Sequence, residues 1–278
     1  MDSWIEPNSG FTEIESEIGR IISAADEKGI PVRTFGGAAI RLRCPLHEYL
    51  YSQLGRSSNH DIDLVTYDEF GSQTRKLFTT LGYEQQVSMV TSMATGTGRR
   101  RLTFYEKFGE KVVDVCLGIL TMSHVIDFSK RLEVDSCTVP LAELALQKLQ
   151  VVEMREKDLQ DMVILLCAHD VGQVDDETIN ADYVAKTLSK DWGFHHTATT
   201  NLRRIAEYAA NHPAISKADK DTVTARVRKI INAIDAEPKT LKWKLRAKVG
   251  TAVKWYNQVE EVEQESRQQM TAIVTSQA

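Results

Sequence analysis

The chain has 278 residues with a formal net charge of −5, and its hydrophobic and charged fractions are 42% and 26%. These values are ordinary for a soluble globular protein and allow one large domain or two modest ones. No apolar run approaches membrane-spanning length and the N-terminus lacks the regions of a signal peptide, so we expect a cytoplasmic protein without membrane contact. Four scattered cysteines, Cys44, Cys116, Cys137 and Cys167, favour buried free thiols over a disulfide framework or a zinc site.

In the first half of the chain, predicted helices alternate with predicted strands. A capping box at Thr12 starts a helix that Gly29 ends, and two more helices are expected at residues 36–44 and 69–81. Strands are expected at residues 31–35, 61–66, 102–106, 111–117 and 131–135, the third and fourth forming a hairpin.

After Pro140, which suits the first position of a helix, the apolar periodicity is almost entirely helical. The predicted helices are residues 141–154, 157–169, 178–188, 199–211, 218–236 and 251–265. The fold class is therefore α+β, with a mixed-sheet domain at residues 1–139 followed by a helical domain at residues 140–278.

The stretch Asp61-Ile62-Asp63-Leu64 alternates acidic and aliphatic side chains, so a strand would project both carboxylates from one face. Two adjacent carboxylates repel each other unless a cation lies between them, and a divalent metal is the usual one, although a solvated edge strand could also carry them. Asp114 lies in an otherwise aliphatic strand, where an unpaired carboxylate is costly to bury. Three such carboxylates from neighbouring strands suit two Mg²⁺ ions, with Mn²⁺ as an alternative.

Gly36-Gly37 lies between a predicted strand and a predicted helix. Glycines let backbone N–H groups approach an anion, and the helix N-terminus favours negative charge, so this turn could hold the phosphates of a nucleoside triphosphate. A purely structural turn is the alternative. The order of glycine turn, paired aspartates and lone aspartate suggests displacement at an α-phosphorus, with metal ions activating a hydroxyl and stabilising pyrophosphate.

On these residues the chain resembles the nucleotidyltransferase superfamily with the DNA polymerase β-type fold. It is more closely similar to bacterial nucleotidyltransferase toxins of the abortive-infection type. That resemblance extends from about residue 30 to residue 170, and its motifs are Arg56 to Asp63, Arg101-Leu102-Thr103-Phe104 before Asp114, and residues 144–150 followed by residues 156–161.

The resemblance implies a role for each matching residue. Asp61, Asp63 and Asp114 would be metal ligands and catalytic residues, and Gly36, Gly37, Arg56, Ser57 and Arg101 would bind the nucleotide. Lys148 would reach the triphosphate, and Asp158 or Asp161 would complete the catalytic site. The alternatives are a solvated lysine at Lys148, charge pairing in a helix N-terminal turn at the two later aspartates, and ordinary loop arginines.

Residues 238–259 contain no acidic side chain but are rich in basic ones. Lys242, Lys244, Arg246 and Lys248, interleaved with aromatic residues, could bind RNA through phosphates and stacking, or could form the solvated face of a helix. His195-His196 lacks metal-ligand spacing with any cysteine, so we expect a structural role at a helix start.

Together these features predict a Mg²⁺-dependent nucleotidyltransferase that transfers a nucleoside monophosphate from a triphosphate such as ATP to a hydroxyl. RNA, most specifically a tRNA 3′ end, is the favoured acceptor in a toxin-like role, and a cognate antitoxin is the partner that such a role implies. The alternatives are transfer to a protein or to a small molecule such as an aminoglycoside, and a non-catalytic nucleotide-binding regulatory module.

Overall fold

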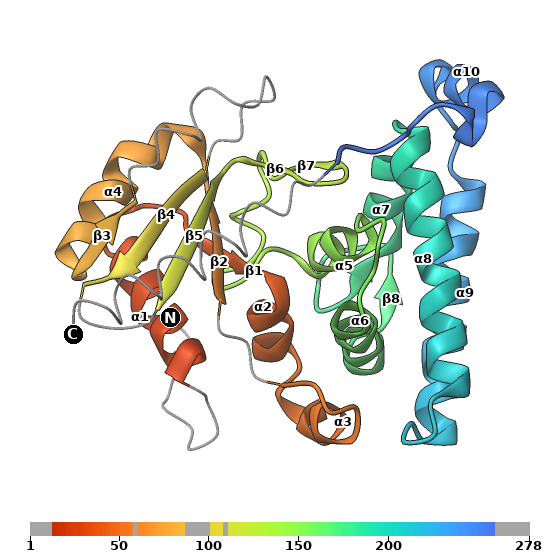
Figure 1. The fold of residues 1–278 in the computed structure, drawn as a ribbon, viewed down its shortest axis with the longest axis horizontal. Helices are drawn as coiled ribbons and strands as arrows, with labels where there is room; N and C mark the ends of the chain where they lie inside the picture. The colour runs from red at the N-terminus through yellow and green to blue at the C-terminus, as the bar shows by residue number, and fades with distance from the viewer. Residues whose placement is uncertain (1–12, 58–60, 87–100, 108–110, 259–278) are drawn as a thin grey trace, which may run out of the picture.

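A five-stranded mixed sheet with helices on both sides forms the first half of the molecule (Figure 1). The computed structural model describes residues 13–57, 61–86, 101–107 and 111–258. The strand order is β1-β2-β5-β4-β3, in which only β2 and β5 pair in parallel. The five strands are β1 (Arg33–Phe35), β2 (Asp61–Thr66), β3 (Tyr83–Gln85), β4 (Arg101–Glu106) and β5 (Val112–Leu117).

The two faces of this sheet differ in chemistry. On one face Ile62, Val113 and Phe104 belong to an apolar core that includes residues of α1 (Glu13–Asp26) and α4 (Gly71–Thr80). Phe78 of α4 stacks on Phe104 with ring centroids 4.1 Å apart. The alternating residues of β2, β4 and β5 project from the opposite face, which carries the aspartates; we call it the carboxylate face.

A second apolar core joins the edge of the carboxylate face to the helical half of the chain. Phe35, Val65 and Cys116 of the sheet share this core with buried residues from α2 to α9. The helices concerned are α2 (Gly36–Arg43), α3 (Glu48–Gln53), α5 (Leu141–Leu149), α6 (Glu156–Ala168), α7 (Ala181–Leu188), α8 (Trp192–Asn211) and α9 (Lys217–Ala236). The α+β class is thus observed, while the division at residues 139 and 140 stays a prediction.

Most predicted elements are present, with shifted ends. The predicted hairpin is β4 and β5, and the helix expected at residues 69–81 is a 3₁₀ turn (Asp68–Phe70) followed by α4. α5 ends at Leu149, before the expected residue 154, because the Asn201 side chain donates to the carbonyls of Leu149 and Val151. Thr12, the predicted cap of the first helix, lies outside the described residues.

The strand predicted at residues 131–135 is wrong, because this segment consists of turns. Arg131 forms ion pairs with the buried Glu143 of α5 and with Asp175, which fixes the segment against the helices instead of in a sheet. A small hairpin of β6 (Ile119–Thr121) and β7 (Val125–Asp127) precedes it, and β8 (Val171–Gly172) pairs in parallel with β9 (Ile179–Asn180).

The helix predicted at residues 251–265 is also wrong in its described part, since residues 253–258 are not helical. The helix lies earlier, as α10 (Leu241–Val249). Thr240 caps its start by accepting a hydrogen bond from Trp243 N, and Gly250, at φ +59°, ends it.

Two expectations from the sequence concern the cysteines and membrane-spanning helices. All four cysteines are free thiols, and Cys44 and Cys116 are buried as expected, whereas Cys137 and Cys167 are half-buried. Within the described residues, no helix is both long and apolar enough to cross a membrane.

Candidate active site

The glycine turn brings the start of α2 against the carboxylate face. Gly36 adopts φ +84°, a left-handed conformation that glycine enters without strain. A Cβ at this position would lie 2.6 Å from Asp63 Oδ2, so the turn and that carboxylate approach each other as closely as a glycine allows. Because Phe35 pairs with Asp63 in the β1–β2 ladder, sheet register fixes this approach.

Strand register brings the predicted aspartates to one face. Asp63 and Asp114 are direct partners in the parallel β2–β5 ladder, and Asp61 precedes Asp63 by two residues on the same side. Thr103 of β4, which is paired with Asp114, donates its hydroxyl to Asp114 Oδ1 at 2.7 Å. The sequence pattern therefore predicted the shared face correctly.

Arg101 supplies positive charge on the same face. Its guanidinium hydrogen-bonds and ion-pairs with Asp114 Oδ2, and its side chain is 34% exposed while that of Asp114 is 6% exposed. The predicted nucleotide-binding arginine thus contacts a predicted metal ligand.

Burial among like charges makes Asp63 an unusual carboxylate. Its pKa is raised from the ordinary 3.8 to about 6, chiefly by burial and also by the neighbouring Asp114 and Asp61, against the lowering effects of Arg101 and Lys148. A carboxylate in this position gains strongly from an additional cation, because a cation favours the charged form.

Four other predicted residues form a buried ion cluster next to this site. Lys148 Nζ of α5 lies 2.9 Å from Asp158 Oδ1 and 2.8 Å from Asp161 Oδ2, both of α6. Arg56 donates to the two oxygens of Asp161 at 2.7 and 3.2 Å, and its remaining nitrogen donates to the carbonyl of Ser57. We call Arg56, Lys148, Asp158 and Asp161 the buried ion cluster.

The charges of this cluster sustain one another. Burial alone would raise the pKa of Asp161, but Lys148 and Arg56 hold it below its ordinary value. Burial likewise disfavours the charged form of Lys148, and Asp161 and Asp158 outweigh it and raise that pKa. Lys148 is therefore held as a cation close enough to Asp63 to influence its titration.

Gln147 is a residue that the sequence reading missed. Its Oε1 accepts a hydrogen bond of 2.8 Å from Gly36 N, so a side chain of α5 provides an acceptor for the N-terminus of α2. Gln147 is 8% exposed. Only its place beside Lys148, on a helix singled out by the resemblance, could have drawn attention to it.

The donor chemistry of the carboxylate face fits a divalent cation. Asp61, Asp63 and Asp114 offer the carboxylate oxygens that Mg²⁺ and Mn²⁺ prefer, and burial together with their mutual repulsion raises the pKa of Asp63. As the described side chains stand, however, no three His, Cys, Asp or Glu residues converge on a common ion position. Arg101 and Thr103 each engage one carboxylate oxygen of Asp114, so a metal at this carboxylate would compete with the Arg101 guanidinium.

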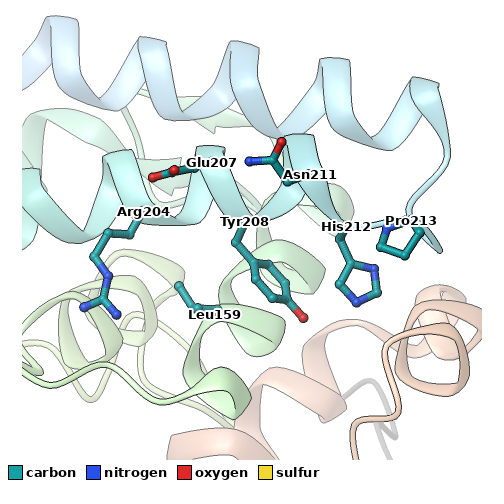
Figure 2. Close-up of a pocket in the computed structure, with 7 residues that line it drawn as sticks. All are labelled: Leu159, Arg204, Glu207, Tyr208, Asn211, His212 and Pro213. Carbon is teal, nitrogen blue, oxygen red and sulfur yellow. The ribbon is translucent and has the colours of Figure 1, made fainter.

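Two surface hollows lie away from these residues. A cavity of about 370 Å³ between α6 and α8 is lined by Leu159 and by residues near the end of α8, with Arg204 and Tyr208 beside Leu159 (Figure 2). It contains none of the predicted site residues. Lys242, Lys244 and Lys248 lie exposed on α10, and a second cavity beside that helix includes Lys242 and Arg246.

The expected structural role of the two adjacent histidines is consistent with their surroundings. His196 stacks on Trp192 in the first turns of α8 at 5.1 Å, and His195 meets Trp243 of α10 edge-on at 5.0 Å. Burial lowers the pKa of His195 to about 4. Both rings therefore act in packing between α8 and the segment that contains α10.

No protein-family model matches the chain, and no curated protein matches its sequence. Among solved structures it is similar to the solution structure of the antibiotic-resistance factor ANT(2'')-Ia, with 14% identity over 80% of this chain and 94% of that chain and a TM-score of 0.32. A crystal structure of ANT(2'')-Ia with adenylyl-2''-tobramycin matches at 14% identity over 78% and 98% of the two chains, with a TM-score of 0.33.

A third similar structure is an antigenic nucleotidyltransferase-like protein from Paracoccidioides brasiliensis, with 14% identity over 82% of this chain and 94% of that chain and a TM-score of 0.34. TM-scores of this size do not establish a common fold. The functional proposal below therefore rests on the side chains of this chain.

Proposed function

We propose that this protein is a divalent-metal-dependent nucleotidyltransferase that moves a nucleoside monophosphate from a nucleoside triphosphate to a hydroxyl and releases pyrophosphate. The observation that carries the proposal is the close approach of Gly36 to Asp63, which pairs directly with Asp114, at a left-handed turn that no larger residue would fit. A purely structural turn does not require two paired carboxylates at its contact point.

In this proposal Asp61, Asp63 and Asp114 hold Mg²⁺ or Mn²⁺. When bound, the metal would lower the pKa of the attacking hydroxyl and neutralise the triphosphate and its leaving group. Gly36 and Gly37 then present the N-terminus of α2 to the phosphates, where the helix dipole and the backbone N–H groups after Gly36, whose own N–H is bonded to Gln147, favour negative charge.

The cationic residues have complementary roles. Arg101, which is partly exposed and bonded to Asp114, would be available to the phosphates when a bound metal neutralised that carboxylate. Lys148 supplies a fixed positive charge from the buried ion cluster, with Asp158 and Asp161 orienting it and Arg56 balancing Asp161. Ser57 adjoins Arg56 at the edge of the same site. Catalysis of this type needs mainly positioning and charge stabilisation.

For the acceptor we favour RNA, most specifically a tRNA 3′ end. The support is the exposed basic helix α10 and the resemblance of residues 30–170 to abortive-infection nucleotidyltransferases, which also motivates a toxin-like role with a cognate antitoxin. A cytoplasmic location, and a catalytic domain of residues 1–139 followed by an acceptor-binding helical domain, belong to the same proposal.

The test is transfer of label from triphosphates labelled at the α-phosphate, with total cellular RNA and total protein as acceptors. Wild-type protein should label RNA only when Mg²⁺ or Mn²⁺ is present, and Asp63→Ala should abolish labelling. Labelling of protein or of an added aminoglycoside would reassign the acceptor. Failure of every triphosphate to label any acceptor would contradict the proposal and favour a regulatory nucleotide-binding module.

A further inference from the structure

A cavity of about 700 Å³ opens where three segments meet near α10. The connection between β6 and β7 contributes Ser123 and His124, the start of α8 contributes Trp192, and α10 with the residues that follow it contributes Trp243 and Trp255. In Figure 1 α10 lies at the end of the helical half, above α8 and α9. We call this hollow the aromatic cavity; its volume is in the range of small-ligand sites.

Basic residues line the aromatic cavity of a protein that is acidic overall. Lys190, Lys242, Arg246 and Lys254 are at its wall, while the chain as a whole has a net charge of −5. Among the described residues that line it, the one acid is Asp191, whose Oδ1 accepts a hydrogen bond of 2.8 Å from Phe194 N and caps α8. This concentration of positive charge favours a polyanionic ligand.

The aromatic rings of the wall are held by neighbouring groups. The guanidinium of Arg246 lies 4.9 Å from the centre of the Trp192 ring, which stacks on His196. Trp255 Nε1 donates to Thr197 Oγ1 at 3.1 Å, which orients the Trp255 ring. A Cβ on Gly193 would lie 2.3 Å from the carbonyl oxygen of Trp255, so the backbone of this segment rests directly on α8.

Arg246 also ties α10 to the segment after it. Its two terminal nitrogens donate to the carbonyls of Gly250 at 2.6 Å and Val253 at 2.7 Å. Tyr256, with the Lys254 ammonium 5.0 Å from its ring centre, lies on the same segment. Rings fixed in advance lose little conformational freedom when a base stacks on them, and exposed lysines beside them can follow a phosphate backbone.

We propose that the aromatic cavity binds single-stranded RNA, with bases stacked on its aromatic rings and phosphates paired with Lys242 and Lys254. Its use as the acceptor site rests on the proposed function, whereas the binding itself does not. Stacking on rings and pairing with phosphates read single strands with little sequence preference, so unpaired RNA is the substrate class that the cavity selects.

The binding test uses the full chain in EDTA without any triphosphate, so it does not depend on transfer activity. The probe is a short fluorescein-labelled oligoadenylate RNA. Three of the four tryptophans of the chain line the cavity, so quenching of intrinsic tryptophan fluorescence reports binding at this place. Wild-type protein should bind with saturable quenching, and its affinity should fall as salt rises.

Two variants separate stacking from charge. Lys242→Ala combined with Lys254→Ala should weaken binding at least about tenfold and reduce the slope of log K against log salt by about 1.4, or about 0.7 for each single-strand phosphate contact. The matched control, Lys28→Ala with Lys76→Ala, removes two exposed charges outside the cavity and should bind as wild type does. Tyr256→Ala should lose about tenfold in affinity and Tyr256→Phe should restore it, because stacking needs only the ring.

Several results would overturn the inference. The first is that wild-type protein does not bind the RNA at about 100 mM salt. The second is that the cavity variants and the control variant lose the same affinity for RNA. The others are that duplex DNA binds as tightly as the RNA, and that an acidic amphipathic peptide quenches the tryptophan fluorescence while RNA does not. RNA binding with the expected variant pattern, but without label transfer in the metal-containing assay, would support this inference and contradict the proposed function.

Discussion

The close approach of Gly36 to Asp63 gives the sharpest prediction, through the substitution Gly36→Ala. An alanine forced to φ near +84° pays about 1–2 kcal/mol for the left-handed conformation. Its methyl group would also lie 2.6 Å from Asp63 Oδ2, where ordinary contact begins at 3.4 Å. Relief of that overlap, by moving the turn or the carboxylate, costs about a further 1–3 kcal/mol.

Gly82→Ala is a matched control for this substitution. Gly82 has φ +90°, and a Cβ there would meet no atom within 4 Å. The control variant therefore carries the backbone strain without the overlap, and should lose only about 1–2 kcal/mol. The difference between the two variants measures the contact between the turn and the carboxylate.

Urea unfolding followed by circular dichroism gives both free energies, and α-phosphate label transfer is measured at a temperature where both variants are folded. Gly36→Ala should be the less stable variant by about 1–3 kcal/mol and should lose transfer activity, while Gly82→Ala keeps it. Equal stability of the two variants, with transfer retained in Gly36→Ala, would refute the reasoning.

Three further predictions concern the charged and polar groups around the turn. In EDTA, the free energy of unfolding of wild type relative to Asp63→Asn should fall by about 2–3 kcal/mol as pH rises from 3.8 to about 6, because Asp63 keeps its proton in the folded state and loses it in the unfolded state. Chemical unfolding of both proteins at several pH values measures this difference. A difference that does not change with pH would contradict the prediction. Gln147→Ala should cost about 1–2 kcal/mol and speed hydrogen exchange of the Gly36 amide, whose acceptor it removes; unchanged exchange would count against the cap. Lys148→Met should lower the free energy of unfolding in urea by about 3–5 kcal/mol, because it leaves the buried carboxylates of Asp158 and Asp161 without the Lys148 cation. The double variant with Asp158→Asn should recover part of that loss, and no recovery would argue against the pairing.

The aspartates were predictable because strand periodicity alone decides which side chains share a face. Asp61 and Asp63 differ by two positions, and Asp114 lies in an apolar strand that had to pair nearby. The direct pairing of Asp63 with Asp114, and the bond from Arg101 to Asp114, depend on the register between strands that are far apart in sequence. No local pattern encodes that register.

The part of the site that the helices contribute could be predicted from the sequence only in part. Arg56, Lys148, Asp158 and Asp161 were named from the resemblance, but their joining in one buried ion cluster is a tertiary outcome of packing α5 against α6. Gln147 gave no local signal, because a glutamine on an amphipathic helix is ordinary.

The two wrong secondary-structure predictions after residue 130 have identifiable physical causes. The sequence around Arg131 favours a strand, yet the ion pairs of Arg131 with Glu143 and Asp175 outweigh that strand preference. At the C-terminal end, apolar spacing beyond residue 251 suggested a helix, but the cap at Thr240 and the glycine at position 250 place α10 earlier. Caps and glycines were the more informative signal there.

The central claim is that Asp61, Asp63 and Asp114 hold a divalent cation for nucleotidyl transfer. Electron paramagnetic resonance of Mn²⁺ counts the free ions directly in the presence of a non-hydrolysable triphosphate, and a sample without protein gives the ions that the triphosphate alone binds. Wild-type protein should bind Mn²⁺ in competition with Mg²⁺, and Asp114→Asn should weaken that binding at least about tenfold while remaining folded. Binding of Mn²⁺ that is unchanged in Asp114→Asn, or its absence in wild type, would contradict the claim.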